Sequence, residues 1–208
     1  MGSPQLPHDP FNVIISGVGG QGNVMASRVL GNMLTLKGLN VTIGETFGAS
    51  QRGGSVMSHL RVSAVSAWSP QIPRGQAHVV VALEPIEALR VLKDYGNPET
   101  RALCNSRPIQ PVGVICGDLN YPALEDIRQW LAEMTGRTWL INATEKAMAL
   151  GHPIFGNIIM IGALAGTGLL PLERDDFASV LARSMTSEKV TANLAAYDTG
   201  AAMVSTEV

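Results

Sequence analysis

Residues 15–30, "ISGVGGQGNVMASRVL", place a glycine-rich turn between an apolar run and a helical pattern, and few folds accommodate this order. The run "FNVIISG" is short and rich in β-branched residues, as expected of a strand buried on both faces of a sheet. From Asn23 to Lys37 apolar residues recur at helical spacing, and Gly38 stands where a helix commonly ends. Strand, turn and helix are therefore contiguous, which indicates an α/β fold.

The rest of the chain continues this alternation. Further strand candidates are "NVTIGE" (40–45), "SVMSHLRV" (55–62), "AHVVVAL" (77–83), "RALCN" (101–105), "VGVICG" (112–117) and "TWLINA" (138–143). "SVMSHLRV" alternates in polarity, which predicts an edge or antiparallel strand with one exposed side. Apolar stripes predict helices over 86–95 and 124–134, and Asn142 with Glu145 resembles a capped helix start. After residue 150 we expect only helices, over 154–169, 172–184 and 187–203. The sum is a doubly wound, mostly parallel, Rossmann-like sheet with helices on both faces and a helical C-terminal extension.

Length and composition limit the number of domains and the classes of partner. With 208 residues, we expect a flexible arm over residues 1–10, which holds prolines, and a single domain over 11–208. The 15 Lys and Arg nearly balance the 17 Asp and Glu, so no global field favours nucleic acid or an anionic membrane. Because 46% of residues are hydrophobic and only 15% are charged, part of the surface should be covered by a partner subunit, or by a second copy when the chain is isolated.

The cysteines argue against a metal site, and the pattern of one apolar segment argues against a membrane span. Cys104 and Cys116 are too far apart for a paired metal motif and have no histidine cluster beside them, so buried thiols in a reducing cytoplasm are expected. Residues 154–170 carry no charge, but prolines bracket them and glycines interrupt them. This favours a buried helix over a membrane span, with close approach of a neighbour at three glycines: Gly156, Gly162 and Gly166.

The glycine turn is the first candidate site. Three glycines fit the GxGxxG pattern: Gly17, Gly19 and Gly22. Glycines permit a tight turn there, and free amides at the helix N-terminus attract an anion. Glu45 falls roughly where dinucleotide-binding folds hold a ribose, which leaves a nicotinamide-dependent enzyme as an alternative. Against it stand the extra Gly20, the polar Gln21 and the lack of a recognisable hydride-transfer constellation. Another alternative is that the glycines only let strand and helix pack closely.

The second candidate site is the loop in "GETFGASQRGGSVMSHLR", residues 44–61. It combines a guanidinium, hydroxyls and unhindered amides, the groups that hold phosphate or carboxylate, at Ser50, Gln51, Arg52, Gly53, Gly54 and Ser55. Alternatively, Arg52 ties down a turn or bridges to a subunit. In open α/β sheets ligands bind beyond the carboxyl ends of the strands, so we expect both loops to converge at one rim of the sheet.

Four motifs in order carry a family resemblance: "GVGGQGNVMASRVLG", "GETFGASQRGGSVMSHLR", "SPQIPRGQAHVVVALEPIEALR" and "NSRPIQPVGV". They resemble the gamma-type subunit of the 2-oxoacid:ferredoxin oxidoreductases, and among these the indolepyruvate type. The likeness runs from about Val13 to Gly200 and includes "SEKVTANLAAYDTG". One departure is Ala49, where the family commonly has Met.

The resemblance implies a share in the oxidative decarboxylation of a 2-oxoacid, an indolepyruvate or other arylpyruvate, with coenzyme A and oxidised ferredoxin. It implies that a companion subunit holds thiamine diphosphate with Mg and the 4Fe-4S clusters, and that ferredoxin reacts through the complex. Two separated cysteines cannot hold a four-cysteine cluster, so the isolated chain should be inactive, with no catalytic residue and no metal of its own.

The resemblance further implies that this chain helps to bind coenzyme A and to close the active site. The candidate ligand or interface positions are Gly17, Gly19, Gly20, Gln21, Gly22, Ser50, Gln51, Arg52, Gly53, Gly54 and Ser55. Two other functions stay open from the residues alone: an NAD-dependent oxidoreductase of Rossmann type, and an assembly subunit that binds no ligand.

Overall fold

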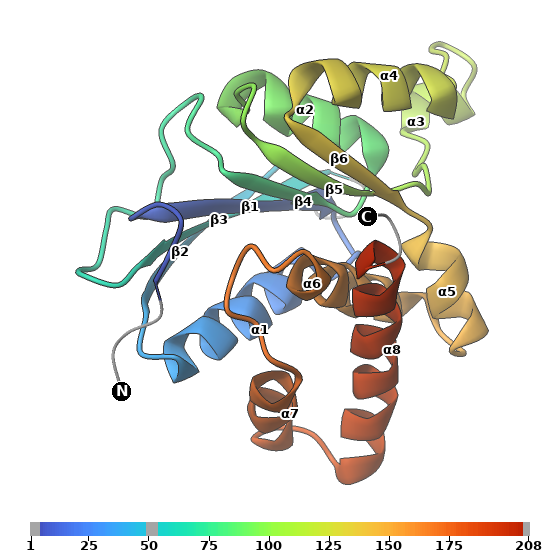
Figure 1. Cartoon of the computed structure of the whole chain (residues 1–208). Coiled ribbons are helices and arrows are strands. Elements are labelled where there is room, and N and C mark those ends of the chain that lie inside the picture. Colours follow the sequence, from blue (N-terminus) through green and yellow to red (C-terminus); the bar gives the residue numbers. More distant parts are fainter. Residues whose placement is uncertain (1–4, 49–53, 206–208) are drawn as a thin grey trace.

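The computed structural model describes residues 5–48 and 54–205, which form one six-stranded sheet between two layers of helices (Figure 1). The strands are β1 (Phe11–Val18), β2 (Asn40–Phe47), β3 (Ser55–Ser63), β4 (Val79–Ala82), β5 (Arg101–Asn105) and β6 (Arg137–Ile141). Their spatial order is β2-β3-β1-β4-β5-β6. Strands β1, β4, β5 and β6 are parallel neighbours, whereas β3 runs antiparallel to both β1 and β2. The predicted α/β class is confirmed.

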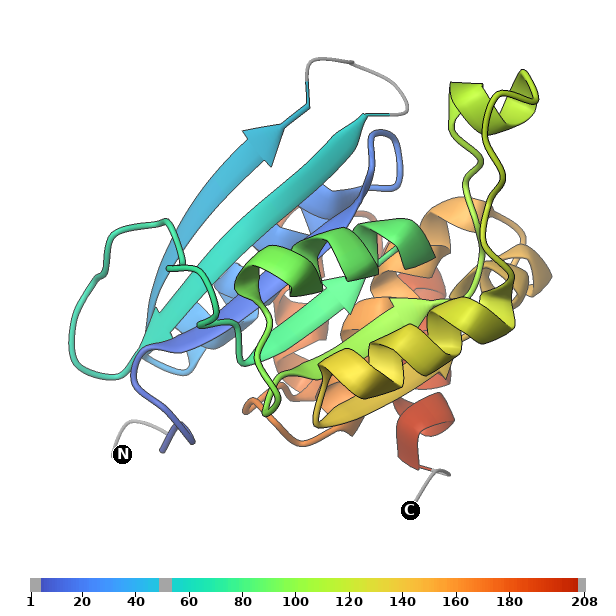
Figure 2. The same cartoon turned by 90° about the horizontal axis from the view of Figure 1, so that it is seen from above.

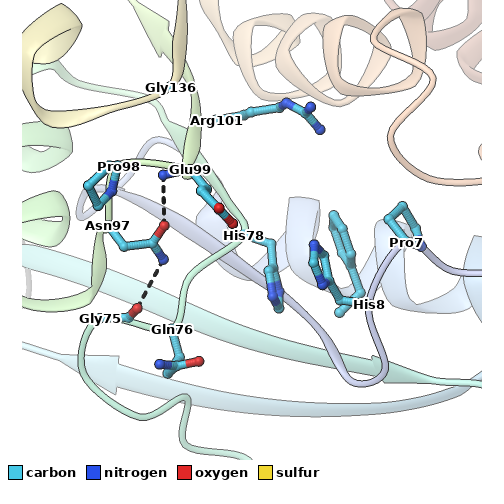
Figure 3. A pocket seen from close by; sticks show the side chains of 11 residues that line it. Pro7, His8, Gly75, Gln76, His78, Asn97, Pro98, Glu99, Arg101 and Gly136 are labelled. Carbon is cyan, nitrogen blue, oxygen red and sulfur yellow. Dashed lines mark hydrogen bonds between the residues drawn. The ribbon is translucent and has the colours of Figure 1, made fainter.

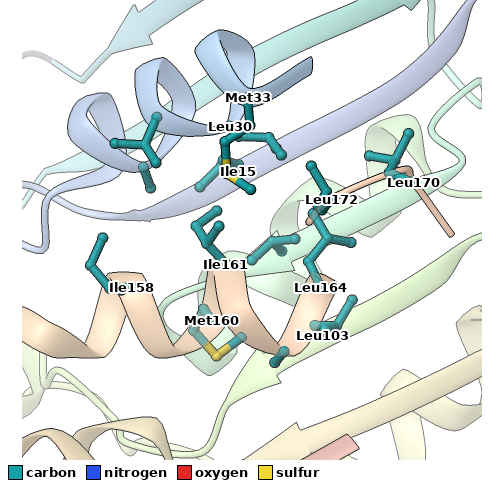
Figure 4. Packing of buried hydrophobic residues seen from close by; sticks show 14 of the residues in the cluster. Ile15, Leu30, Met33, Leu103, Ile158, Met160, Ile161, Leu164, Leu170 and Leu172 are labelled. Atoms are coloured by element: carbon teal, nitrogen blue, oxygen red, sulfur yellow. The ribbon is translucent and has the colours of Figure 1, made fainter. Parts of the chain in front are cut away.

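Helices cover both faces of the sheet. One face carries α2 (Pro85–Tyr95) and α4 (Leu124–Met134), and the other carries α1 (Asn23–Leu36) and the C-terminal helices (Figure 1). These are α5 (Ala143–Ala149), a 3-10 turn (Pro153–Phe155), α6 (Gly156–Gly166), α7 (Arg174–Ala182) and α8 (Ser187–Ser205). Figure 4 shows Ile161 of α6 facing Ile15 of β1 and Leu30 of α1, and Leu164 of α6 beside Leu103 of β5 and Leu172, all in the larger core.

Strand β3 differs from its prediction. It is antiparallel, as its alternation allowed, but it lies inside the sheet, and β2 forms the edge. Its polar face is buried, because the connection to β4 covers it: His59 accepts a hydrogen bond from the Ile72 amide (3.3 Å), and the Arg61 guanidinium lies 4.9 Å from the Trp68 ring centre. The prediction that one side of this strand is exposed is therefore wrong. Its polar groups are buried because hydrogen bonds and ring contacts satisfy them.

The segment "VGVICG" is not a strand. Residues Val112–Ile115 form the short helix α3 within an arm, residues 106–123, that leaves the end of β5 and returns to α4 (Figure 2). Strand β5 already has a paired strand on each side, β4 and β6. Prolines at 108, 111 and 122 also disfavour the pairing of another strand in this segment. Because Cys116 lies on this arm, its thiol is exposed, so the expectation of a buried thiol holds for Cys104 and is wrong for Cys116.

Helices α6 and α8 cross with their backbones in close contact. A Cβ on Gly162 would overlap the carbonyl oxygen of Tyr197, and a Cβ on Gly166 would lie 2.6 Å from the carbonyl oxygen of Ala201. The predicted close approach is confirmed at these two glycines and wrong at Gly156, which has nothing within 4 Å of an added Cβ. Within the described ranges, no helix is long and apolar enough to span a lipid bilayer.

Candidate functional site

The glycine turn and the end of the second loop meet at one rim of the sheet. Val18 at the end of β1 pairs with Ser55 at the start of β3, and the Gly19 amide donates a 2.9 Å hydrogen bond to the Gly54 carbonyl. The two loops are therefore neighbours, as expected for the carboxyl end of β1. The middle of the second loop, with the predicted Ser50, Gln51, Arg52 and Gly53, lies outside the described residues.

The turn needs glycine at its last position. Gly22 is the N-cap of α1, has a φ of 85°, and no side chain caps the first turn of the helix. A Cβ at this position would overlap Nδ2 of Asn157, which donates to the Gly22 carbonyl (3.3 Å). With no side-chain cap, the first amides of α1 keep the capacity to bind an anion.

Both polar atoms of the Gln21 side chain bind backbone groups of the protein itself. Its Oε1 accepts from the Val18 amide (2.7 Å), and its Nε2 donates to the Leu83 carbonyl (2.8 Å). A Cβ on Gly17 would lie 2.6 Å from that same Oε1, so glycine at position 17 makes room for the bridge. Gln21 therefore joins the ends of β1 and β4 and holds the turn in place.

A pocket of about 390 Å³ opens beside this rim. Its lining combines residues from all four motifs, including the predicted Gly54 and Ser55. The other described site predictions, Gly17, Gly19, Gly20, Gln21 and Gly22, form the neighbouring turn and do not line the pocket. The lining residues are Val18, Gly54, Ser55, Glu84, Ile86, Glu87, Arg90, Ile109, Gln110, Pro111, Val112 and Tyr121.

Glu84 organises one wall of the pocket. It follows β4, is 1% exposed, and accepts three hydrogen bonds: from Tyr121 Oη (2.5 Å), the Ile109 amide (3.3 Å) and the Glu87 amide (2.9 Å). The last bond caps α2. Burial, followed by the hydrogen bond to Glu84, raises the pKa of Tyr121 well above its usual range, so its hydroxyl stays protonated.

Glu87 and Arg90 form the charged mouth of the pocket. Glu87 Oε2 accepts from Ser55 Oγ (2.5 Å), and Glu87 Oε1 lies 3.0 Å from Arg90 Nη1. The Glu87 side chain is 7% exposed, whereas that of Arg90 is 58% exposed. Arg90 therefore has one nitrogen on Glu87 and further N–H donors at the mouth, where a guanidinium can bind phosphate or carboxylate.

Sequence reasoning missed this acidic wall and Arg90. One available signal was the order of residues in "VALEPIEALR": an acid directly after a buried strand and before a proline that begins a helix. Such an acid lies at the carboxyl end of the strand and caps the helix. Tyr121 gave no comparable signal, because it reaches Glu84 only through the return of the arm, 37 residues along the chain.

The register of the sheet places Glu45 away from the glycine turn. Glu45 pairs with Ser58, which in turn pairs with Ile15, so β3 lies between the acid and β1. Two strand spacings amount to about 10 Å. In a dinucleotide-binding fold the ribose-binding acid ends the strand next to β1, so this register weighs against the NAD alternative.

A larger pocket of about 860 Å³ lies at the opposite end of the sheet. There the His78 ring stacks on those of both His8 and Phe11, with ring centres 4.4 and 5.1 Å away. Figure 3 shows His78 beside His8, with Glu99 and Arg101 also in the lining. These residues precede or begin strands, whereas ligands of open α/β sheets bind beyond the strands' carboxyl ends. We therefore take the smaller pocket as the candidate site. Within the described part of the chain, no cluster of His, Cys, Asp or Glu is arranged to hold a metal ion.

Comparisons with known proteins agree with the motifs. The family model described as pyruvate ferredoxin/flavodoxin oxidoreductase matches residues 12–203. The chain is 38% identical over 190 residues to indolepyruvate oxidoreductase subunit IorB of Archaeoglobus fulgidus, covering 91% of this chain and 93% of the relative. It is 36% identical over 191 residues to the subunit of the same name from Pyrococcus horikoshii, covering 91% and 94%.

Solved structures share the fold. Pyruvate oxidoreductase subunit PORC from Thermotoga maritima superposes with a TM-score of 0.68 at 20% identity, covering 94% of this chain and 97% of that one. The 2-oxoglutarate:ferredoxin oxidoreductase from Magnetococcus marinus, solved with 2-oxoglutarate, coenzyme A and succinyl-CoA, gives a TM-score of 0.75 at 20% identity. That match covers 97% of this chain and 32% of the other. From the family match and these identities, the chain belongs to the pyruvate ferredoxin/flavodoxin oxidoreductase family.

Proposed function

We propose that this chain is the subunit of an indolepyruvate-type 2-oxoacid:ferredoxin oxidoreductase that binds coenzyme A and helps to close the active site. The observation that carries the proposal is the meeting of four separate motifs at one pocket beside an uncapped helix N-terminus. Relatives named as indolepyruvate oxidoreductase subunits, similar over nine-tenths of their length, support the substrate class.

The charged groups around the pocket indicate where each part of coenzyme A would bind. The wall formed by Glu84 and Glu87 disfavours phosphate groups, because buried carboxylates repel anions. The amides that begin α1, and Arg90 at the mouth, favour them. We therefore assign the phosphates of coenzyme A to the turn and the mouth, and its uncharged amide arm to the pocket. Arg52 completes the cation set in this proposal.

The reacting centre belongs to a companion subunit in this proposal. Thiamine diphosphate with Mg supplies the decarboxylation chemistry, and 4Fe-4S clusters pass electrons to ferredoxin. The described residues do not fit these groups: one free cysteine is buried and the other is on the exposed arm, and the carboxylates of the pocket already accept hydrogen bonds from protein groups. The chain's own share is to bind, orient and enclose the cosubstrate. We place the complex in the cytoplasm.

Calorimetric titration of the purified chain with coenzyme A tests the ligand. Arg90→Ala removes the guanidinium at the mouth and should weaken binding at least about tenfold, as expected for the loss of a charged hydrogen bond of roughly 1.5–3 kcal/mol. Arg128→Ala is the matched control, because Arg128 also pairs with a glutamate three residues earlier but on α4, outside the pocket. Equal affinity of the two variants would contradict the assignment of Arg90.

Two further measurements separate the alternatives. Tight binding of NADH by the isolated chain, with no response to coenzyme A, would favour a nicotinamide-dependent enzyme. An Arg52→Ala complex that assembles normally and keeps the wild-type KM for coenzyme A would favour a pure assembly subunit, whereas a raised KM supports the proposed role of that loop.

A further inference from the structure

The arm of residues 106–123 stands out from the body of the protein, yet its base is firmly fixed (Figure 2). Glu84 accepts hydrogen bonds from both sides of the base, from the Ile109 amide and from Tyr121 Oη. On the outgoing side, the Ser106 amide also donates to the Ile141 carbonyl (2.8 Å). The buried carboxylate of Glu84 therefore holds both sides of the arm's base against the sheet.

The tip of the arm has a defined conformation of its own. The Asp118 and Leu119 amides both donate to the Gly113 carbonyl, at 2.8 and 3.0 Å. The Leu119 side chain packs so closely on α3 that a Cβ added to Gly113 would lie 3.0 Å from it. The tip is therefore a preformed surface, which lowers the ordering cost of binding a partner.

This preformed tip presents large apolar side chains to solvent. Val112 is 74% exposed, Ile115 is 69% exposed and Leu119 is 62% exposed. Over the whole arm the charged residues are Arg107 and Asp118, which cancel. Three neighbouring apolar groups on a neutral projection match the composition of an interface core and are unfavourable in water.

The tip is continuous with the candidate site. Ile109, Gln110, Pro111 and Val112 line the pocket, and Val112 belongs to both the pocket and the tip. A protein that covers the tip therefore also covers the mouth of the pocket. In the proposed function the reacting groups belong to the companion subunit, so a ligand in the pocket would meet them across this rim.

We propose that the tip formed by Val112, Ile115 and Leu119 is the docking surface for the catalytic companion subunit, which seats an apolar, weakly charged surface over the mouth of the pocket. This inference rests on the proposed function for the identity of the partner. A second copy of this chain fits less well, because it would cover the pocket without adding the missing reactive groups.

The test reconstitutes the complex from the purified companion subunit and variants of this chain, and measures association by analytical gel filtration and light scattering. Ile115→Asp places a charge on the tip without touching the pocket lining, and should weaken association at least about tenfold. Val65→Asp is the control, because Val65 is 83% exposed but follows β3 at the opposite end of the sheet. It should associate like the wild type.

Separate readouts keep the two proposals distinguishable. Circular dichroism and urea midpoints verify that both variants fold, and Ile115→Leu should restore association. If Ile115→Asp and Val65→Asp assemble equally well, the docking surface is refuted. If Ile115→Asp abolishes self-association of the isolated chain and leaves the complex intact, the tip binds a second copy and the proposal is overturned. If the chain fails to bind coenzyme A but Ile115→Asp alone breaks the complex, the docking surface stands while the ligand assignment fails.

Discussion

At the scale of single residues, the rim of the sheet depends on side chains that bind the backbone. Gln21 joins the Val18 amide to the Leu83 carbonyl, and Asn157 reaches the Gly22 carbonyl from α6. Gln21 lies in the turn itself, whereas Asn157 reaches the turn from a helix 135 residues further along the chain. The glycine turn is therefore held in shape before any ligand arrives, which reduces the cost of binding.

Gly22→Ala should destabilise the protein by about 2 kcal/mol or more, because it combines an unfavourable positive φ with an overlap at Asn157 Nδ2. Gly38→Ala is the matched control: its φ is +79°, but nothing lies within 4 Å of an added Cβ. It should cost about 1 kcal/mol, from the backbone alone. Urea unfolding measures both, and equal losses would show that the contact with Asn157 contributes nothing.

At the scale of elements, the crossing of α6 and α8 joins the C-terminal extension to the sheet. Two glycines face the partner helix from opposite sides of the contact: Gly162 faces the Tyr197 carbonyl and Gly200 faces the Ile159 carbonyl. Helix α6 is buried almost throughout and packs on α1 and β1, so this crossing holds the helical extension against the glycine-turn side of the molecule (Figure 4).

Gly162→Ala should force the two helices apart and lower the free energy of unfolding by about 3 kcal/mol, in the range of overpacked cores. Gly156→Ala changes the same helix at its first residue, where nothing lies within 4 Å of the new Cβ. It should be neutral or stabilising by up to about 1 kcal/mol, since Ala is the better helix former. Denaturant unfolding of both variants checks this, and a neutral Gly162→Ala would contradict the close backbone contact.

At the scale of the whole molecule, the two ends of the sheet differ in chemistry. The carboxyl ends of β1, β4 and β5 carry the glycine turn, the acidic wall and the arm, whereas the other end carries the stacked His8, His78 and Phe11. His78 Nδ1 accepts a hydrogen bond from the Asn12 amide (2.9 Å). Because Nδ1 can accept only when it carries no proton, this bond favours the neutral form of the ring. The acid-sensitive histidine and the proposed ligand site therefore lie at opposite ends of the sheet.

Acid should destabilise the protein through His78. Burial, with a smaller contribution from His8 and opposed by Glu99, lowers the pKa of His78 from 6.5 to about 4. Protonation therefore favours the unfolded state: stability is complete above pH 6.5 and declines as the pH falls from 6.5 towards 4. His59, whose pKa burial also lowers, acts in the same direction.

Urea unfolding at pH 7, 6 and 5 tests this dependence. His78→Gln should be less stable than the wild type at neutral pH, because the ring stack is lost, yet its stability should change less with pH. A variant that loses as much stability on acidification as the wild type would show that His78 does not contribute to the acid sensitivity.

Local sequence was enough to predict the strand–turn–helix start, most helices and the meeting of the glycine turn with the end of the second loop. These follow from local periodicity, glycine chemistry and the rule that parallel strands share a carboxyl edge. The cap at Asn142 is confirmed in the same way, since Asn142 accepts from the Glu145 amide (3.4 Å).

Three features became visible only in the folded chain: β3 is inserted between β1 and β2, "VGVICG" lies on an arm, and one pocket is shared by Glu84, Glu87, Arg90 and Tyr121. Strand order and long-range hydrogen bonds depend on which surfaces meet after folding. Local pattern does not encode them: the polar residues of β3 have the same alternation whether water or the connection to β4 covers them.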